Sequence, residues 1–235
     1  MTTLNNPKTI TIRGRLSFPR FSHKEAVAGA LRSKIAQVQK TAQTEPNEIA
    51  PEFNLLLEPD QLDKLVQHVR TEFLPFALDR SKKGEKTDAL DAKQVARIES
   101  LLDADDWADQ PPYLMIKDLS PQNKEVAPET VASLKVVGSK GRDIKVEATV
   151  FSEDQLLVPD ANILTFPVRK PIGETVFQPY AGAYFIATLN LYAYAPNPGL
   201  FGISASASTA FYMGNLEGEA FGAGNTVDED SIFMD

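Results

Sequence analysis

The chain has 235 residues, no cysteine and a formal net charge of −8. This length suits one domain with appendages, and the lack of cysteine excludes both a disulfide scaffold and a thiolate metal site. No signal-peptide-like segment opens the sequence, and no uninterrupted apolar run is long enough to cross a bilayer. We therefore expect a cytoplasmic protein without a membrane partner.

Charge is distributed unevenly along the chain. Residues 1–40 carry a net charge of +7, residues 41–110 carry −8, and residues 111–170 are balanced. No basic residue follows Lys170, so the last 65 residues carry −7. The molecule thus combines a basic head with an acidic end.

The first half of the chain predicts two strands and three helices. Apolar residues alternate with Arg13 and Arg15 from Thr9 to Phe18, which indicates a strand that ends at Pro19. Further elements are expected as a helix over 24–40, a buried strand over 53–57, a helix over 60–73 capped by Asp60, and a helix over 87–102.

From Pro111 onward the composition is that of strands. We expect a strand over 113–119, a polar loop over 120–129, and a hairpin in which strands 132–137 and 144–151 flank a turn at GSKGRD. Additional strands are predicted at 174–177, 184–194 and 202–212.

The stretch AGAYFIATLNLYAY, residues 181–194, is the most informative. In an extended chain its core face would hold Phe185, Ala187, Leu189, Leu191 and Ala193. The opposite face would carry three tyrosines, whose rings offer flat surfaces for stacking nucleic-acid bases. The alternative is that these tyrosines are ordinary half-buried strand residues.

Residues suited to catalysis are scarce. The two histidines, His23 and His68, do not combine with a nucleophile in any recognisable pattern. The acidic run at 103–106 lacks the glycine and distal glutamate of a calcium loop, so it reads as a solvated helix end. We expect no enzyme activity, no metal and no cofactor.

Binding chemistry is better represented, because cations for phosphates and rings for bases are both present. The candidate DNA-binding residues are Arg13, Arg15, Phe18, Arg20, Lys24, Trp107, Tyr113, Lys117, Tyr184, Tyr192 and Tyr194.

The C-terminal segment, residues 222–235, is rich in glycine and acidic residues and is expected to be disordered. Its end combines acidic and apolar side chains in the manner of a docking peptide. The candidate docking residues are Asp228, Glu229, Asp230, Phe233 and Asp235.

Several segments together resemble the single-stranded DNA-binding proteins of tailed bacteriophages. They are RLSFP at 15–19, the strand, proline and helix over 53–73, the tyrosine-rich stretch at 181–194, and GISA at 202–205. The resemblance implies a β-rich α+β fold, in which an oligonucleotide/oligosaccharide-binding (OB-fold) β-barrel is elaborated with helices. One domain would span 1–221, with helical elaborations at 24–40 and 60–102, followed by a disordered acidic tail at 222–235.

The resemblance also implies a function. The protein would bind single-stranded DNA without sequence preference in phage replication, recombination and repair, in the bacterial cytoplasm. Its tail would compete with DNA for the basic groove and dock partners such as a polymerase, a helicase or primase, or a nuclease. A virion structural or assembly protein is the main alternative, and a nuclease is the third.

Overall fold

A computed structural model describes residues 6–21, 50–103, 107, 111–149, 169–170, 181–207 and 209–213. Three predicted segments lie outside these residues: the helix over 24–40, the strand over 174–177 and the tail over 222–235.

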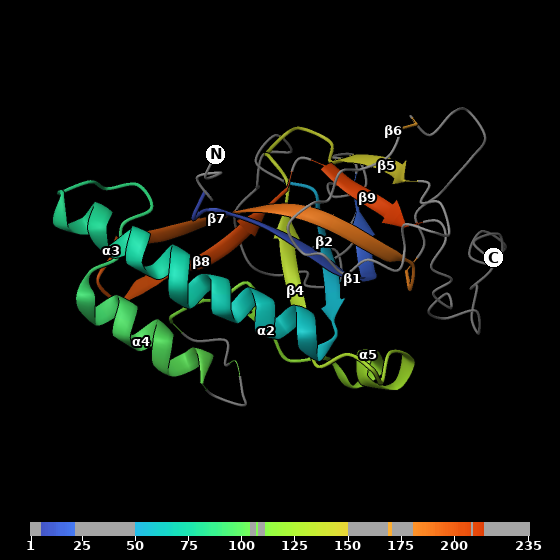
Figure 1. Cartoon of the computed structure of the whole chain (residues 1–235), viewed down its shortest axis with the longest axis horizontal. Coiled ribbons are helices and arrows are strands. Elements are labelled where there is room, and N and C mark those ends of the chain that lie inside the picture. Colours follow the sequence, from blue (N-terminus) through green and yellow to red (C-terminus); the bar gives the residue numbers. More distant parts are fainter. Residues whose placement is uncertain are drawn as a thin grey trace, which may run out of the picture.

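Five strands form a closed barrel (Figure 1). They are β1 (Thr9–Arg20), β2 (Glu52–Leu57), β4 (Ala132–Val137), β7 (Tyr184–Asn197) and β8 (Leu200–Ser206). Around the barrel the order is β1-β2-β4-β8-β7, and pairing of β7 with β1 closes it. Within these five strands, β4 and β8 run parallel and every other neighbouring pair is antiparallel. This topology is that of an OB-fold, so the predicted fold class is confirmed.

Strand β1 bends around a corner of the barrel at Gly14. Its first half pairs with β7 and its second half pairs with β2, and Arg15 has a partner on both. A Cβ at Gly14 would lie 2.8 Å from the Leu56 carbonyl oxygen, so a side chain would not fit at this crossing. Contrary to prediction, Pro19 does not end the strand. A β-bulge between Ser17 and Arg20 shifts the register around the proline, and the strand continues to Arg20.

Strands β8 and β9 (Thr209–Met213) follow each other along β7. Asn190 pairs with Ser206, whereas Ala187 pairs with Ala210, so the register shifts by one residue between the two strands. The predicted strand over 202–212 is therefore interrupted. The interruption falls where the chain leaves β4, its neighbour in the barrel, and pairs with β5 (Lys145–Thr149).

The predicted hairpin around GSKGRD is wrong. Strand β4 pairs with β2, β8 and the short β3 (Ile116–Lys117), while β5 pairs with β9 and with β6 (Arg169–Lys170). Sequence proximity suggested a local pairing, but each strand has its partners elsewhere in the sheet.

A long excursion leaves the barrel after Leu57 and returns at Ala132, its cross-strand partner. It contains α2 (Pro59–His68), the π-helical turn η2 (Val69–Phe73), α3 (Leu74–Lys82) and α4 (Ala92–Leu102). The first helix continues past the predicted end, and its N-cap is Glu58 rather than Asp60. Helix α4 begins later than predicted, at a capping box formed by Asp91 and Gln94. None of the helices in the described part of the chain is both long and apolar enough to span a membrane.

The end of the excursion also differs from prediction. The strand expected over 113–119 is reduced to β3, and the expected polar loop contains helix α5 (Pro121–Val126). Ser120 starts this helix, because its Oγ accepts a hydrogen bond from the Asn123 amide at 3.2 Å. A helix this short has no apolar periodicity to reveal it. It packs on the outer face of β2 through a small cluster of Leu56, Leu119 and Ala127.

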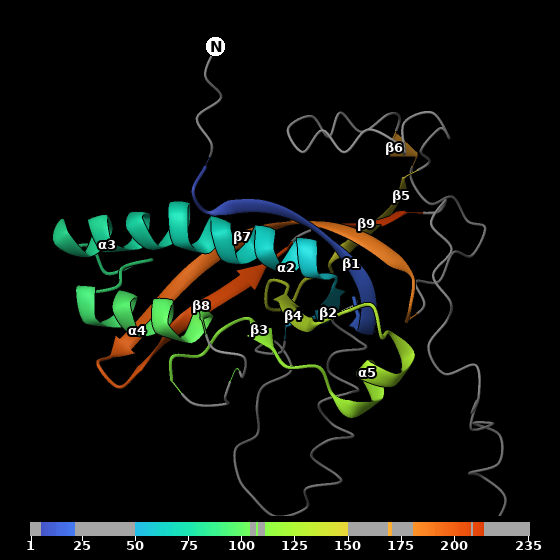
Figure 2. The same cartoon turned by 60° about the horizontal axis from the view of Figure 1, so that its bottom comes forward.

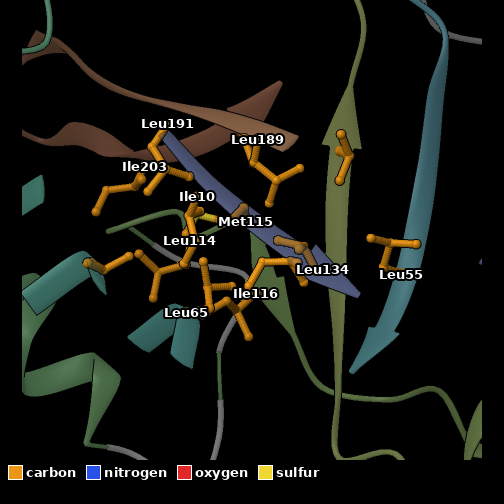
Figure 3. Close-up of a cluster of buried hydrophobic side chains, with 14 of the residues drawn as sticks. Ile10, Leu55, Leu65, Leu114, Met115, Ile116, Leu134, Leu189, Leu191 and Ile203 are labelled. Carbon is orange, nitrogen blue, oxygen red and sulfur yellow. The ribbon is translucent and has the colours of Figure 1, made fainter. Parts of the chain in front are cut away.

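The main core lies inside the barrel and beneath the helices (Figure 3). Leu65 of α2 and the segment from Leu114 to Ile116 pack against side chains from the barrel strands. On β7 the predicted inner face, from Phe185 to Ala193, is buried as expected. Burying each large apolar side chain contributes about 1.5–3 kcal/mol. Figures 1 and 2 place α3 and α4 along the far ends of β7 and β8, and α5 at the other end of the barrel.

Candidate nucleic-acid interface

The outer face of β7 and β8 carries two neighbouring tyrosines. Tyr192 and Tyr194 alternate with buried residues of the core face and are only partly buried. Their cross-strand partners on β8 are Ser204 and Gly202, which are small. On the β8 side, the two rings therefore have only small side chains as cross-strand neighbours.

Tyr113 joins these two residues from the excursion. Its amide donates to the Phe201 carbonyl at 3.0 Å, and its carbonyl accepts from the Ile203 amide at 2.9 Å. A Cβ at Gly202 would lie 2.0 Å from the Tyr113 oxygen and 2.8 Å from the Tyr194 Oη, so only glycine fits there. Burial, together with Tyr192 and Tyr113 nearby, raises the pKa of Tyr194. We call Tyr113, Tyr192 and Tyr194 the tyrosine cluster.

A groove of about 600 Å³ lies on the outer face of the barrel between α5 and the strands β2 and β4. Asn54 of β2, and Ser133 and Lys135 of β4, contribute to it from the sheet. Other lining residues include Phe18, Lys117 and Asn123. We call this the α5 groove.

Phe18 stands at the edge of the α5 groove with 56% of its surface exposed. It lies in the bulge of β1 with a φ of 48°, a conformation that a bulky side chain adopts only under strain. Strained residues of this kind concentrate at functional sites. The bulge thus turns a large apolar ring outward.

Side chains of both charges line the α5 groove, because Asp118 lies there beside the lysines. Lys117 and Lys135 line it, and Lys135 donates to Glu52 at 2.7 Å while Arg20 lies 3.5 Å from the same carboxylate. Because one carboxylate serves two cations, it does not neutralise both. The exposed position of these groups also makes the ion pairs weak and exchangeable.

The tyrosine cluster and the α5 groove are joined by one stretch of chain. Tyr113 belongs to the cluster and Lys117 lines the groove. Four residue steps of extended chain span at most about 13 Å. The two sites are therefore neighbours on the outer face, across β8, β3 and β4.

The two N-terminal arginines lie elsewhere on that face, beside Tyr184. Arg13 donates to Glu58 at 2.8 Å, and the Tyr184 hydroxyl donates to the other oxygen of the same carboxylate at 3.0 Å. Burial and the Glu58 charge raise the pKa of Tyr184. Tyr184 is eight residues from Tyr192, about 26 Å along an extended strand. The structure thus does not bring Tyr184 together with the tyrosine cluster.

Arg15 is only 7% exposed. It donates to the Gly182 carbonyl at 3.0 Å and to Glu129 at 2.7 Å, and its guanidinium lies 5.8 Å from the centre of the Tyr184 ring. Although burial acts to raise the pKa of Glu129, the hydrogen bond from Arg15 outweighs it and the pKa is lowered. We call Arg13, Arg15, Glu58, Glu129 and Tyr184 the Arg–Glu network. Its two cations are matched by two carboxylates.

Trp107, another predicted residue, is not part of either site. Trp107 lies partly buried in a separate pocket with Leu62 and Val66 of α2, and packs against the core. Lys24 and the tail residues, namely Asp228, Glu229, Asp230, Phe233 and Asp235, lie outside the described residues.

Sequence reasoning selected only Phe18 and Lys117 among the residues that line the α5 groove, and those it missed include Asn54, Asn123, Ser133 and Lys135. The alternation of Ser133 and Lys135 with apolar residues in β4 was a usable signal for an outward polar face. Asn54 gave little signal, because it sits within an otherwise apolar run. Asn123 could be predicted as a groove residue only if helix α5 had been recognised.

The barrel and its connections define the chain as an OB-fold protein with a helical excursion. Among solved structures it is similar to the single-stranded DNA-binding protein from bacteriophage Enc34, with 13% identity, a TM-score of 0.46, and coverage of 96% of this chain and 90% of that one. The same phage protein in complex with single-stranded DNA matches with 11% identity, a TM-score of 0.46, and coverage of 92% and 90%. The similarity to phage single-stranded DNA-binding proteins that was predicted from the sequence is thus confirmed at the level of the fold.

Comparisons of sequence alone give no match. No model of a protein family matches this chain, and no curated protein matches it.

Proposed function

We propose that this protein binds single-stranded DNA along the outer face of its barrel, through the tyrosine cluster and the α5 groove. The observation that carries the proposal is their proximity: Tyr113 of the tyrosine cluster is only four residues from Lys117 of the α5 groove, and the groove also holds an exposed phenylalanine. The α5 groove lies on the second and third barrel strands, the face through which OB-folds bind oligonucleotides.

The chemistry of this surface suits an unpaired strand. Bases of a single strand are free to stack on aromatic rings, and such stacking tolerates any sequence. Lys117, Lys135 and Arg20 would neutralise phosphates and release counterions. In a duplex the faces of the bases are covered, so the rings would find no partner. We assign the Arg–Glu network to holding the barrel together rather than to phosphate contacts.

We further propose that the acidic tail, residues 222–235, competes with DNA for this surface and docks replication or recombination partners through Phe233 and its acidic neighbours. The charge pattern supports this, because all seven charged residues after Lys170 are acidic. A tethered competitor acts at a high effective concentration. Truncation after Gly222 should then strengthen binding to single-stranded DNA, most visibly at low salt. Equal affinity of both forms across a salt titration would contradict the competition.

The test of DNA binding is a titration of labelled oligothymidine and of a duplex of equal length, followed by fluorescence anisotropy at two salt concentrations. We expect tight binding of the single strand, weaker binding of the duplex, and loss of affinity with salt. Absence of oligothymidine binding at low salt, with the tail removed, would overturn the proposal.

A further inference from the structure

We propose that the α5 groove takes up one unstacked nucleobase and reads its polar edge, so that binding depends on the base at one position of the strand. This inference rests on the proposed function and deepens it. Stacking on the tyrosine cluster alone would be indifferent to sequence.

Phe18 forms one wall of the groove, and its exposed ring favours a planar apolar ligand. Its ring is the most exposed of the large apolar side chains in the described part of the chain, and it is held outward by a strained bulge rather than by packing. An exposed ring costs free energy in the unbound protein, because its apolar surface stays in water. Stacking with a base would recover that free energy.

The floor of the groove offers polar groups that the protein itself leaves unused. Neither the Asn54 amide nor the Ser133 hydroxyl forms a hydrogen bond with any residue that the structure describes. Asn123, across the groove on α5, is only 6% exposed, and its side-chain oxygen lies 3.5 Å from the Ser17 hydroxyl. The side-chain amide of Asn54 presents a donor and an acceptor side by side, as the edge of a base does.

These features together distinguish a base from other occupants. A phosphate would need the lysines at the rim but not an aromatic wall or an amide on the floor. An apolar peptide side chain would leave Asn54 and Ser133 without partners, which is costly in a shielded site. The volume of about 600 Å³ lies within the range of small-molecule sites and is large enough for a nucleotide. With Lys117 and Lys135 at the rim, the backbone phosphates on either side of the base have partners as well.

The experiment uses the full chain and the shortest oligothymidine that binds with full affinity. Each position in turn is replaced by an abasic site, and separately by adenine, cytosine or guanine. At one position we expect the abasic site to weaken binding about 5- to 20-fold, and the four bases to differ by a similar factor. In the N54A/S133A variant the differences among the bases at that position should fall below about twofold.

Two further variants separate a base pocket from a general loss of affinity. In F18A the abasic substitution at the sensitive position should cause a smaller loss than in the wild type, because the stacking contact is already gone and only the contacts to the edge of the base remain. The control is K135A, which should weaken the binding of every oligonucleotide in the series by the same factor, whichever position is substituted. Thermal unfolding of each variant shows whether it is folded.

A second measurement does not depend on these variants. 5-Iododeoxyuridine placed at the sensitive position of the oligonucleotide should crosslink, on irradiation, to the peptide that contains Phe18. Crosslinks confined to peptides of the tyrosine cluster would overturn the inference, as would an equal effect of every position or an unchanged base profile in N54A/S133A. In those cases the proposed function would stand, whereas failure of the wild-type protein to bind oligothymidine would remove both.

Discussion

The Arg–Glu network and the α5 groove place the same chemical groups side by side on one barrel face, and yet they differ in what those groups can do. In the network each arginine already holds a carboxylate, at 2.8 Å for Arg13 and 2.7 Å for Arg15. Around the groove, Glu52 is shared by Lys135 and Arg20, and the ring of Phe18 has no cover. A cation beside a ring is held by its own carboxylate in the first region, whereas in the second we propose that it contacts DNA.

The difference shows that acidic residues far along the chain determine which arginines are held in ion pairs. Glu58 lies 45 positions from Arg13, and Glu129 lies 114 positions from Arg15. Neither is apparent from the alternating pattern that makes the two arginines look like a phosphate-binding face.

The largest effect should come from removing the open rings. We expect Y192A/Y194A to weaken oligothymidine binding about 100-fold, because stacking contributes about 1–3 kcal/mol per base. Fluorescence anisotropy with a labelled strand measures the loss. The control is Y184F, which removes only the hydroxyl bonded to Glu58 and should bind DNA like the wild type. If the two variants were equally impaired, the distinction between the regions would fail.

The next effect concerns stability rather than binding. R15A should lower the free energy of unfolding by about 2 kcal/mol, since it leaves Glu129 and the Gly182 carbonyl without their buried partner. Urea denaturation measures this. R13A is the comparison: the Arg13 side chain is 37% exposed against 8% for Arg15, so its loss should cost less than about 1 kcal/mol. An R15A protein as stable as wild type, but defective in DNA binding, would place Arg15 in the interface after all.

A smaller effect is expected in the salt dependence of binding. K117A/K135A should reduce the slope of log affinity against log salt by about 1.4, since each lost phosphate contact on a single strand contributes about 0.7. R13A should leave the slope unchanged, because Arg13 lies in the Arg–Glu network and outside the proposed path of the DNA. Titrations at four or more salt concentrations give the slopes. A flatter slope in R13A than in the double lysine variant would locate the phosphate path along β1.

The smallest effect is a response to acid. Because Arg15 lowers the pKa of Glu129 below its ordinary value of 4.5, the pair stabilises the fold fully above that pH and loses its contribution as pH falls through the lowered value. E129Q should therefore be less stable than wild type at pH 7, and the difference should be smaller at pH 3. Urea denaturation at both values tests this. A constant difference between the two proteins would mean that Glu129 does not titrate with unfolding.

Most of the barrel could be predicted from the sequence where the pattern is strictly local. The alternation along β7 correctly assigned Phe185 and Leu191 to the core, and Tyr192 and Tyr194 to the outer face. Ile186, on the predicted outer side, is nevertheless buried, because neighbouring strands flank it at that point.

The rest depends on contacts that no local pattern encodes. The pairing of β5 with β9 rather than β4 joins segments more than sixty residues apart. To predict the α5 groove, one would have had to recognise a helix of only six residues and the outward position of Asn54 within an apolar strand. Tyr113 was selected as an aromatic near a strand, but its place in the tyrosine cluster follows from a bridge to Gly202.

The helical excursion begins and ends at residues that face each other across two paired strands, Leu57 and Ala132. For the barrel, 74 residues of chain therefore occupy the position of a hairpin loop, and lengthening such a loop costs little because closure entropy grows only logarithmically. The same loop supplies Tyr113, Lys117 and α5 to the surface proposed for DNA. Its length and sequence can consequently change without lengthening any barrel strand, so the residues that the loop adds to this surface can vary while Tyr192, Tyr194 and Asn54 stay fixed on the barrel.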